Sequence, residues 1–397
     1  MNLNLFKLKQ RCEEVFNLSV LFSTQKDGRS GESIIQTSSL CWAGIFQCIL
    51  GMKSVKALEE WMKTNPLAHK LLPAHKKATP GSDSTILSAA KGWDTDKLQW
   101  MVNKVVIKLK ELGYFNRRLL TGRKVRVCAL DGSCFGNHWM AVLSALGEKI
   151  TAPLDIVRYN KKGKEIPAAR KILKRLNKTA AKYFTHCVVD GLYSVKEFMN
   201  EVPETGLQWV VKTSQKNLCP IRWAKKIFDD CSTLKKLREY NVELVEAGDL
   251  KRKIDYRIWL VKKVPWEEVK RTLSVAKVQL THRAGKKKGM EETFWIISTD
   301  EELTAVELRE LVLWRWGIEN NLFRELNQRV GSKTKYIKNG ATKHTLMWLW
   351  MLGWVIFQWI RIEFDETIQK LSANIRITKR WITEMLKAHS YFKLAGG

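Results

Sequence analysis

Two short apolar runs, each ending in Asp-Gly, constrain the fold of this chain most strongly. The run KVRVCAL precedes Asp131 and Gly132, and the run FTHCVV precedes Asp190 and Gly191. Apolar runs of this length beside turn-forming pairs predict strands buried in a sheet, each with an aspartate at its tip. Asp-Gly after a strand is also a common turn, so either aspartate alone has an ordinary structural explanation.

A third acidic residue, Glu319, lies inside the helical segment ELRELVLWRWGIENNLFRELNQ. Its neighbours at helical spacing form an apolar stripe: Val312, Trp316, Phe323 and Leu326. A carboxylate on a buried stripe is costly unless a cation meets it. The cation is either a metal ion shared with the two aspartates or Arg315, four residues earlier on the same helix.

Charge and cysteine content bound the function classes. The formal net charge is +29, from 69 Lys and Arg against 40 Asp and Glu. Such an excess indicates a polyanionic partner, nucleic acid first and an anionic membrane surface second. The 8 cysteines contain no CxxC pair, which favours reduced thiols in a cytoplasmic protein over a zinc ribbon. The apolar run 344–360 is shorter than the roughly 20 residues of a membrane span, so we expect a buried core helix.

The pattern along the chain predicts an α/β protein. After a helical beginning, period-two runs give the order strand, strand, strand, helix, strand, helix, strand, which is typical of a mixed sheet. A second group of strand-like runs follows, and then helices. Thr299 and Glu302 form a possible capping box at the start of the Glu319 helix. We therefore divide the chain into a helical N-terminal DNA-binding or packing domain (1–120), a first α/β segment (121–213), a β-rich insertion (214–298) and a second segment with the Glu319 helix and C-terminal helices (299–397).

Two strand-end aspartates and one helical glutamate suit divalent metal chemistry. Mg²⁺ prefers hard oxygen ligands and takes few carboxylates. Phosphoryl transfer on a nucleic acid backbone suits two such ions about 3.5–4 Å apart. Asp131 would be the bridging ligand, with Asp190 and Glu319 each holding one ion.

Several segments resemble DDE transposases of bacterial insertion sequences. They are WRWGIENNLFRELNQ, KGKEIPAARKILKRL, VVDGLYSVKEF and the N-terminal LGMKSVKALEEW. The acidic residues are spaced by 59 residues from Asp131 to Asp190 and by 129 from Asp190 to Glu319. This spacing is similar to the branch in which a β-rich insertion between the second Asp and the Glu splits an RNase H-like catalytic domain. The resemblance implies an α/β fold with an RNase H-like mixed sheet flanked by helices.

The resemblance also implies an activity and its partners. Asp131, Asp190 and Glu319 would be the catalytic triad and hold two Mg²⁺ ions, for which Mn²⁺ can substitute. The enzyme would cleave DNA at element ends and transfer the strands into target DNA. Its partners would be double-stranded DNA carrying terminal inverted repeats, target DNA and a second copy of the chain, with no membrane. The expected place is the bacterial cytoplasm, at the nucleoid.

Many relatives carry a Tyr and an Arg before the Glu and a Lys after it. Arg315 stands at the Arg position, whereas Val312 and Leu326 stand at the Tyr and Lys positions. Arg324 or Lys333 are the candidate substitutes. The residues we expect to contact DNA are Arg315, Arg324, Lys333, Lys335, Lys286, Lys287 and Lys288. The candidates to receive a flipped base, a role that an insertion aromatic has in related enzymes, are Trp223, Trp259, Trp266 and Trp295.

Three other hypotheses stay open at this point. The chain is a metal-dependent nuclease that does not transfer strands, or a DNA-binding protein whose catalysis has decayed. A membrane-anchored protein is the third, and it depends only on the run 344–360.

Overall fold

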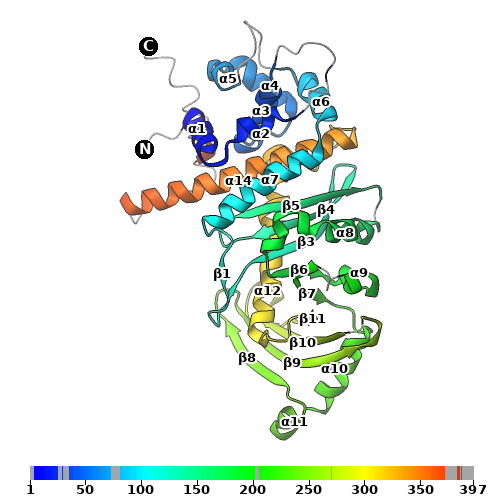
Figure 1. Ribbon diagram of the computed structural model, residues 1–397. Coiled ribbons are helices and arrows are strands. Elements are labelled where there is room, and N and C mark those ends of the chain that lie inside the picture. Colours follow the sequence, from blue (N-terminus) through cyan, green and yellow to red (C-terminus); the bar gives the residue numbers. More distant parts are fainter. Residues whose placement is uncertain are drawn as a thin grey trace.

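The computed structural model describes residues 4–25, 29, 35–72, 81–161, 163–201, 205–269, 271–371, 382–384 and 386. Most of the last stretch of the expected C-terminal helices, 377–397, lies outside these residues. Figure 1 shows a helical layer above a long mixed sheet, with further helices against the sheet. The mixed α/β class with a helical N-terminal region is confirmed.

The N-terminal region is helical, as predicted. Its helices are α1 (Leu5–Phe16), α2 (Leu18–Ser23), α3 (Thr37–Ile49), α4 (Val55–Thr64), α5 (Pro66–Leu71), α6 (Asp83–Gly92) and α7 (Thr95–Glu111). The side chain of Ser54 caps α4 by accepting from the Ala57 N–H, and Asp94 caps α7 in the same way. Side-chain caps of this kind satisfy N–H groups that have no partner within the helix.

The apolar run 344–360 forms part of the long helix α14 (Gly340–Leu371). This helix contacts α3, α6, α7 and β5 (Thr151–Tyr159), so it lies between the N-terminal helices and the sheet (Figure 1). By length and composition it could cross a membrane, but 94% of its apolar window is buried inside the protein. The prediction of a buried core helix is therefore confirmed.

One nine-stranded sheet runs through the described residues in the order β5-β4-β3-β6-β7-β11-β10-β9-β8. The remaining members are β3 (Val127–Phe135), β4 (His138–Leu146), β6 (His186–Asp190), β7 (Gln208–Thr213), β8 (Glu243–Asp249), β9 (Ile254–Trp266), β10 (Arg271–His282) and β11 (Glu291–Ser298), and a separate pair is formed by β1 (Arg117–Arg118) and β2 (Lys124–Val125). The β3–β6 and β6–β7 pairs are parallel, and the other pairs of the sheet are antiparallel. The strands of the insertion thus extend the catalytic sheet through the β11–β7 pair, while the domain boundaries stay predictions.

The remaining helices lie against or beyond this sheet. They are α8 (Glu165–Lys174), α9 (Lys196–Glu201), α10 (Cys219–Asp230), α11 (Leu234–Glu239), α12 (Ala305–Ile318) and α13 (Arg324–Val330). Short 3-10 segments cover η1 (Leu176–Lys178), η2 (Ala180–Tyr183), η3 (Gly191–Tyr193), η5 (Glu267–Val269) and η6 (Gly285–Lys287). A π-helical turn, η7 (Glu319–Phe323), joins α12 to α13.

The start of the Glu319 helix was predicted five residues too early. Thr304, and not Thr299, is its N-cap, and a capping box with Glu307 is present. The pair Thr299 and Glu302 has the same sequence pattern. However, the Thr299 hydroxyl donates to Gln208 and accepts from the Trp209 N–H, both of β7. It is therefore bonded to the sheet and does not cap the helix.

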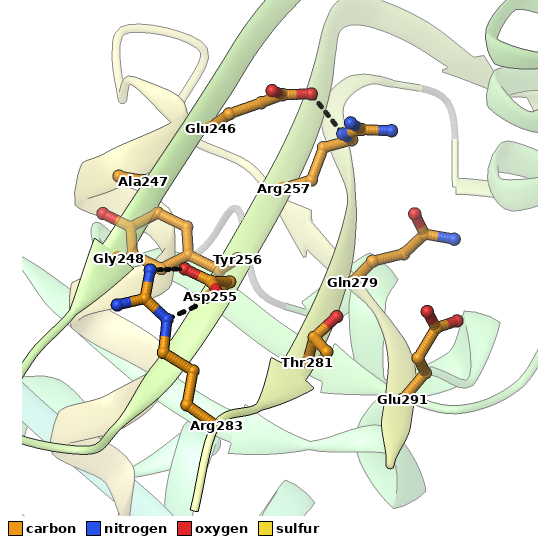
Figure 2. A pocket seen from close by; sticks show the side chains of 10 residues that line it. All are labelled: Glu246, Ala247, Gly248, Asp255, Tyr256, Arg257, Gln279, Thr281, Arg283 and Glu291. Carbon is orange, nitrogen blue, oxygen red and sulfur yellow. Dashed lines mark hydrogen bonds and ion pairs between the residues drawn. The ribbon is translucent and has the colours of Figure 1, made fainter. Parts of the chain in front are cut away.

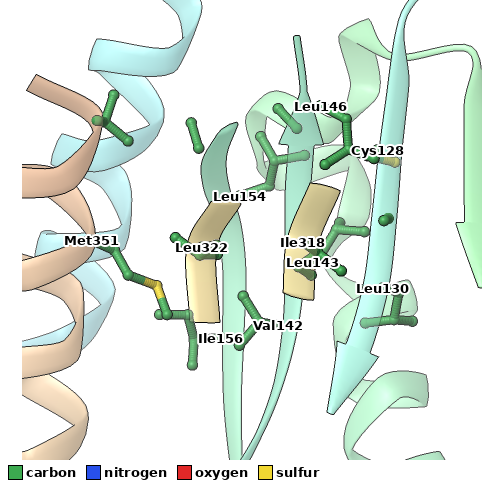
Figure 3. Close-up of a cluster of buried hydrophobic side chains, with 14 of the residues drawn as sticks. Cys128, Leu130, Val142, Leu143, Leu146, Leu154, Ile156, Ile318, Leu322 and Met351 are labelled. Atoms are coloured by element: carbon green, nitrogen blue, oxygen red, sulfur yellow. The ribbon is translucent and has the colours of Figure 1, made fainter. Parts of the chain in front are cut away.

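Apolar packing on the sheet holds the turn that carries Glu319. Figure 3 shows Ile318 and Leu322 beside Leu143 of β4, with Met351 of α14 beyond Leu322. Ile318, Leu322 and Met351 are fully buried. Fully burying such a side chain contributes about 1.5–3 kcal/mol. Because buried residues flank Glu319 on both sides, the position of its backbone is fixed by the core.

Candidate functional site

Asp131 lies in the middle of β3, where it pairs with Val142 of β4. The prediction that it ends its strand is wrong, because β3 continues to Phe135 and the chain turns at Gly136, whose φ is +72°. Gly132 has no positive φ. A Cβ on Gly132 would lie 2.2 Å from the Glu165 carboxyl group, so this glycine is required by close packing and not by a turn.

Asp190 is the last residue of β6, as predicted. The parallel register pairs Ala129 of β3 with Val188 of β6. Extending that register by two residues places Asp131 level with Asp190 on adjacent strands, which lie about 4.8 Å apart. Side chains at the same level of a parallel pair point to the same face of the sheet. Asp190 also accepts a hydrogen bond from the Leu192 N–H at 2.9 Å.

Arg315 connects Asp131 to Glu319. Its Nη1 lies 3.3 Å from Asp131 Oδ2, and its Nη2 lies 3.0 Å from Glu319 Oε1. The Arg315 side chain is 8% exposed, whereas that of Glu319 is 37% exposed. Glu319 is therefore less buried than the apolar stripe predicted, because Trp316, one turn earlier, is itself exposed. The guanidinium supplies the positive charge on which the two carboxylates converge.

Burial and neighbouring charges raise the pKa of Asp131 to about 7. Burial is the largest cause, Arg315 acts against it, and the charges of Asp190, Glu319 and Glu165 raise the pKa further. Like charges that crowd a buried carboxyl disfavour its ionised form. Perturbed carboxyl groups of this kind are typical of functional sites.

Asp131 and Glu319 open into one hollow of about 430 Å³, whose other lining residues include Arg324 and Lys333. Asp190 lines a second hollow of about 780 Å³ together with Arg315 and Trp316. Arg315 therefore lies next to all three predicted triad members. As the side chains stand, no three His, Cys, Asp or Glu groups of the described residues are arranged to hold a metal ion. The donors present are hard carboxylate oxygens, which is the ligand type that Mg²⁺ takes.

The other basic residues predicted to contact DNA lie at two places. Lys335 is exposed, and a Cβ on Gly136, beyond the end of β3, would lie 3.6 Å from its Cα. Lys286, Lys287 and Lys288 are exposed at the tip of the β10–β11 hairpin. Because β11 runs antiparallel to β7, and β7 parallel to β6, this tip lies at the Asp190 end of the sheet. Lys287 is paired with Glu292 at 2.5 Å.

The two departures from the relatives' signature have a structural basis. Val312 and Leu326 are buried in the core at 1% and 0% exposure, so a Tyr and a Lys at these positions would point into apolar packing. Arg324 and Lys333 instead bring positive charge to the hollow that contains Glu319.

The insertion tryptophans differ in exposure. Trp266 and Trp295 are buried, and Trp295 stacks on Phe228. Trp259 is half-buried beneath Arg257 and Lys277, and Trp223 is 39% exposed on α10. Trp316, which was read as part of an apolar stripe, is 41% exposed beside Asp190.

Glu165, the first residue of α8, was also missed. It accepts hydrogen bonds from Tyr193 at 2.5 Å and Tyr159 at 3.3 Å, and its charge acts on Asp131. A glutamate in the first turn of a helix is ordinarily explained by the helix dipole. The sequence therefore gives no sign of this contact.

Another hollow is lined by residues of β8, β9, β10 and β11 and by Arg283, and Figure 2 shows its lining. Its charges are largely paired with one another, since Glu246 bonds Arg257 and Asp255 bonds Arg283. It contains none of the three predicted triad residues. It is therefore a weaker candidate for chemistry than the hollow at Asp131.

Comparisons with known proteins identify the family of the chain. No curated protein matches the chain. A family model described as "Transposase DDE domain" matches residues 134–356. The match covers more than half of the chain, includes Asp190 and Glu319 and begins three residues after Asp131. The nine-stranded mixed sheet with its helical N-terminal region is consistent with an RNase H-like transposase fold. The chain belongs to the family of DDE transposases.

Proposed function

We propose that this transposase cleaves DNA at the ends of a mobile element and joins those ends to target DNA. Asp131, Asp190 and Glu319 would hold the two divalent metal ions that the reaction uses. The observation that carries the proposal is the convergence of acidic groups on Arg315, together with the effect of Asp190 and Glu319 on the Asp131 pKa.

The residues fit divalent ions in their chemistry. Three carboxylates supply hard oxygen donors, and an added cation would relieve the repulsion that raises the Asp131 pKa. Bound Mg²⁺ supplies charge stabilisation for phosphoryl transfer. Arg315 bonds one oxygen of Asp131 and one of Glu319, so an ion shared by these carboxylates would use their other oxygens or displace the guanidinium.

Basic residues would hold the DNA backbone at this site. Arg324 and Lys333 line the hollow that contains Asp131 and Glu319, so a phosphate in that hollow would meet positive charge beside the acidic groups. Lys286 and Lys288 would meet DNA that extends past Asp190. Cationic side chains bind phosphates without reading sequence.

The test uses linear DNA that carries the terminal inverted repeats flanking the gene, a supercoiled plasmid target, and Mg²⁺, Mn²⁺ or EDTA. We expect plasmid products joined to the linear ends, and only with a divalent ion. Asp131→Asn, Asp190→Asn and Glu319→Gln should each abolish cleavage and leave DNA binding in a mobility-shift assay largely intact. Glu246→Gln, which changes an exposed carboxylate of the insertion, is the matched control and should remain active.

Other outcomes would favour the alternatives. Cut ends without joining would support a nuclease. DNA binding without any cleavage, in every divalent ion, would support a protein whose catalysis has decayed. Full activity of any triad variant would contradict the assignment of that residue. Because two element ends must be held together for joining, we also expect a dimer when the terminal DNA is present, measurable by sedimentation.

A further inference from the structure

Glu165 of α8 lies directly on the backbone that follows Asp131. A Cβ at position 132 would be 2.2 Å from both Cδ and Oε2 of Glu165. The Gly132 N–H donates to Asp131 Oδ1 at 2.9 Å. Neighbouring residues of a strand point to opposite faces. Glu165 therefore contacts β3 from the face opposite to the one on which Arg315 meets Asp131.

Glu165 also holds the backbone that follows Asp190. Its Oε1 accepts from the Tyr193 hydroxyl at 2.5 Å. Tyr193 is fully buried and belongs to η3, the turn that begins directly after Asp190 and is capped by the Asp190 side chain. One carboxylate thus contacts the residue after Asp131 and the turn after Asp190.

We propose that Glu165 is a positioning residue that fixes the separation of the Asp131 and Asp190 carboxylates. Ionised carboxylates on neighbouring strands repel each other, so the parts of β3 and β6 that carry Asp131 and Asp190 would relax apart without an anchor. A connection through Gly132 and Tyr193 opposes that movement before any ion is bound. The inference depends on the proposed role of both aspartates in holding metal ions.

Glu165 is not itself a candidate metal ligand. The described residues that line the hollow at Asp131 and Glu319 do not include it, and neither do those that line the hollow at Asp190. Two tyrosine hydroxyls already donate to its oxygens, Tyr193 to Oε1 and Tyr159 to Oε2. Its effect on a bound ion would therefore pass through the aspartates.

The test measures Mn²⁺ binding to the full chain without DNA, by the loss of the free-ion paramagnetic resonance signal. Residues that orient metal ligands typically change metal affinity by about 10–100-fold when they are replaced. We expect Glu165→Gln and Tyr193→Phe each to weaken Mn²⁺ binding by about tenfold or more. The Mg²⁺ concentration needed for half-maximal cleavage should rise in the same proportion.

Two matched variants separate positioning from general stability. Tyr159→Phe removes the other hydroxyl that bonds Glu165, but Tyr159 ends β5 and follows neither aspartate. Glu201→Gln removes a carboxylate that joins α9 to Arg170 of α8. Both variants should lose no more than about threefold in Mn²⁺ affinity, even where thermal unfolding shows a stability loss like that of Glu165→Gln.

The Mn²⁺ affinities of these variants decide whether Glu165 has the positioning role. Wild-type Mn²⁺ affinity in Tyr193→Phe, or equal losses in Tyr193→Phe and Glu201→Gln, overturns the positioning role. If Glu165→Gln does not fold, Tyr193→Phe decides alone, because it removes a single oxygen. A wild-type chain that binds Mn²⁺ but cuts no DNA contradicts the proposed function and leaves the Glu165 result valid. A wild-type chain that binds no Mn²⁺ overturns both.

Discussion

Two buried aspartates of this protein have opposite pKa shifts. Burial favours the neutral form of both. At Asp300, hydrogen bonds from His186 and the Glu302 N–H and the charge of Arg123 outweigh burial and lower the pKa to about 2. At Asp131, burial raises the pKa by more than the Arg315 charge lowers it. The charges of Asp190, Glu319 and Glu165 raise the Asp131 pKa further. Asp300 thus has enough hydrogen-bond donors and positive charge around it to stabilise its ionised form. Asp131, the candidate catalytic aspartate, does not, so its environment suits an added cation.

Asp300 therefore gives a stability prediction with a definite pH window. Its folded pKa lies below the unfolded value of 3.8, so its contribution is present above about pH 4 and is lost as pH falls through about 2. The shift corresponds to about 2 kcal/mol at neutral pH. Asp300→Asn should lower the free energy of unfolding in urea by about that amount at pH 7 and by progressively less below pH 4. The exposed Asp229→Asn is the control. A deficit in Asp300→Asn that is equal at pH 7 and pH 3 would contradict the linkage.

The sequence predicted the structural position of single residues where a strand or helix pattern was present. The strand end at Asp190 and the helical segment around Glu319 are both as predicted, while their role as site residues stays a prediction. Gly132 was misread as a turn former, because the sequence cannot show that a carboxylate from α8 lies over its Cα. Glu165 was missed for the same reason, since its partners come from β3, β5 and η3. The part of the candidate site that depends on contacts between distant segments could not be predicted from sequence patterns.

At the scale of elements, the Glu319 segment is positioned by its packing and not by its own helical regularity. The helix changes to a π-helical turn at Glu319 and returns to α13 at Arg324. Insertions of this kind are frequent at functional sites. The succession of strands and helices along the chain and the extra strands of the insertion were predicted from apolar periodicity, and the buried helix α14 from the length of its apolar run. The π-helical turn and the later start of α12 were not predicted, because both depend on contacts between these side chains and the sheet.

Gln358 gives a prediction for the docking of α14 on the sheet. It is 3% exposed in an apolar helix, and its side chain bonds the N–H and C=O of Thr151 at the start of β5, each at 2.9 Å. Gln358→Leu would leave both buried backbone groups without these partners, at a cost of about 1–3 kcal/mol each. We expect urea unfolding to show a loss of roughly 2–6 kcal/mol for the two groups together. Met351→Leu, a volume-conserving change in the same helix, should cost less than about 1.5 kcal/mol. Wild-type stability in Gln358→Leu would show that this contact is unimportant to the fold.

At the scale of the whole molecule, the charge is far from balanced and its placement matters more than its sum. The net charge is +29, yet many basic side chains are neutralised by partners, including Arg257, Arg283 and Lys287. Arg324 and Lys333, both exposed, face the hollow that contains Glu319. These pairs already cancel within the +29 total, so the total does not say where the remaining positive charge lies. The salt dependence of binding measures the part of that charge that contacts DNA.

That dependence yields a prediction for the β10–β11 tip. Each lysine that neutralises a DNA phosphate contributes about 0.9 to the slope of log affinity against log salt concentration. Replacing Lys286 and Lys288 with Gln should therefore reduce the slope by about 2, measured by fluorescence anisotropy with terminal-repeat DNA between 50 and 200 mM salt. Lys287 is retained because it is paired with Glu292.

The control removes two equal charges from the same insertion, as Lys235→Gln and Arg238→Gln on α11. This helix has no buried residue and lies at the lower end of the molecule in Figure 1, well below β6, the strand that ends in Asp190. If general cationic character governed binding, both double variants would lose the same slope, because they have the same net charge. If DNA instead follows a defined path over the β10–β11 tip, the variant of Lys286 and Lys288 should lose more of the slope than the α11 variant. Equal losses would remove the hairpin tip from that path and leave Arg324 and Lys333 as the nearest phosphate contacts to the acidic residues.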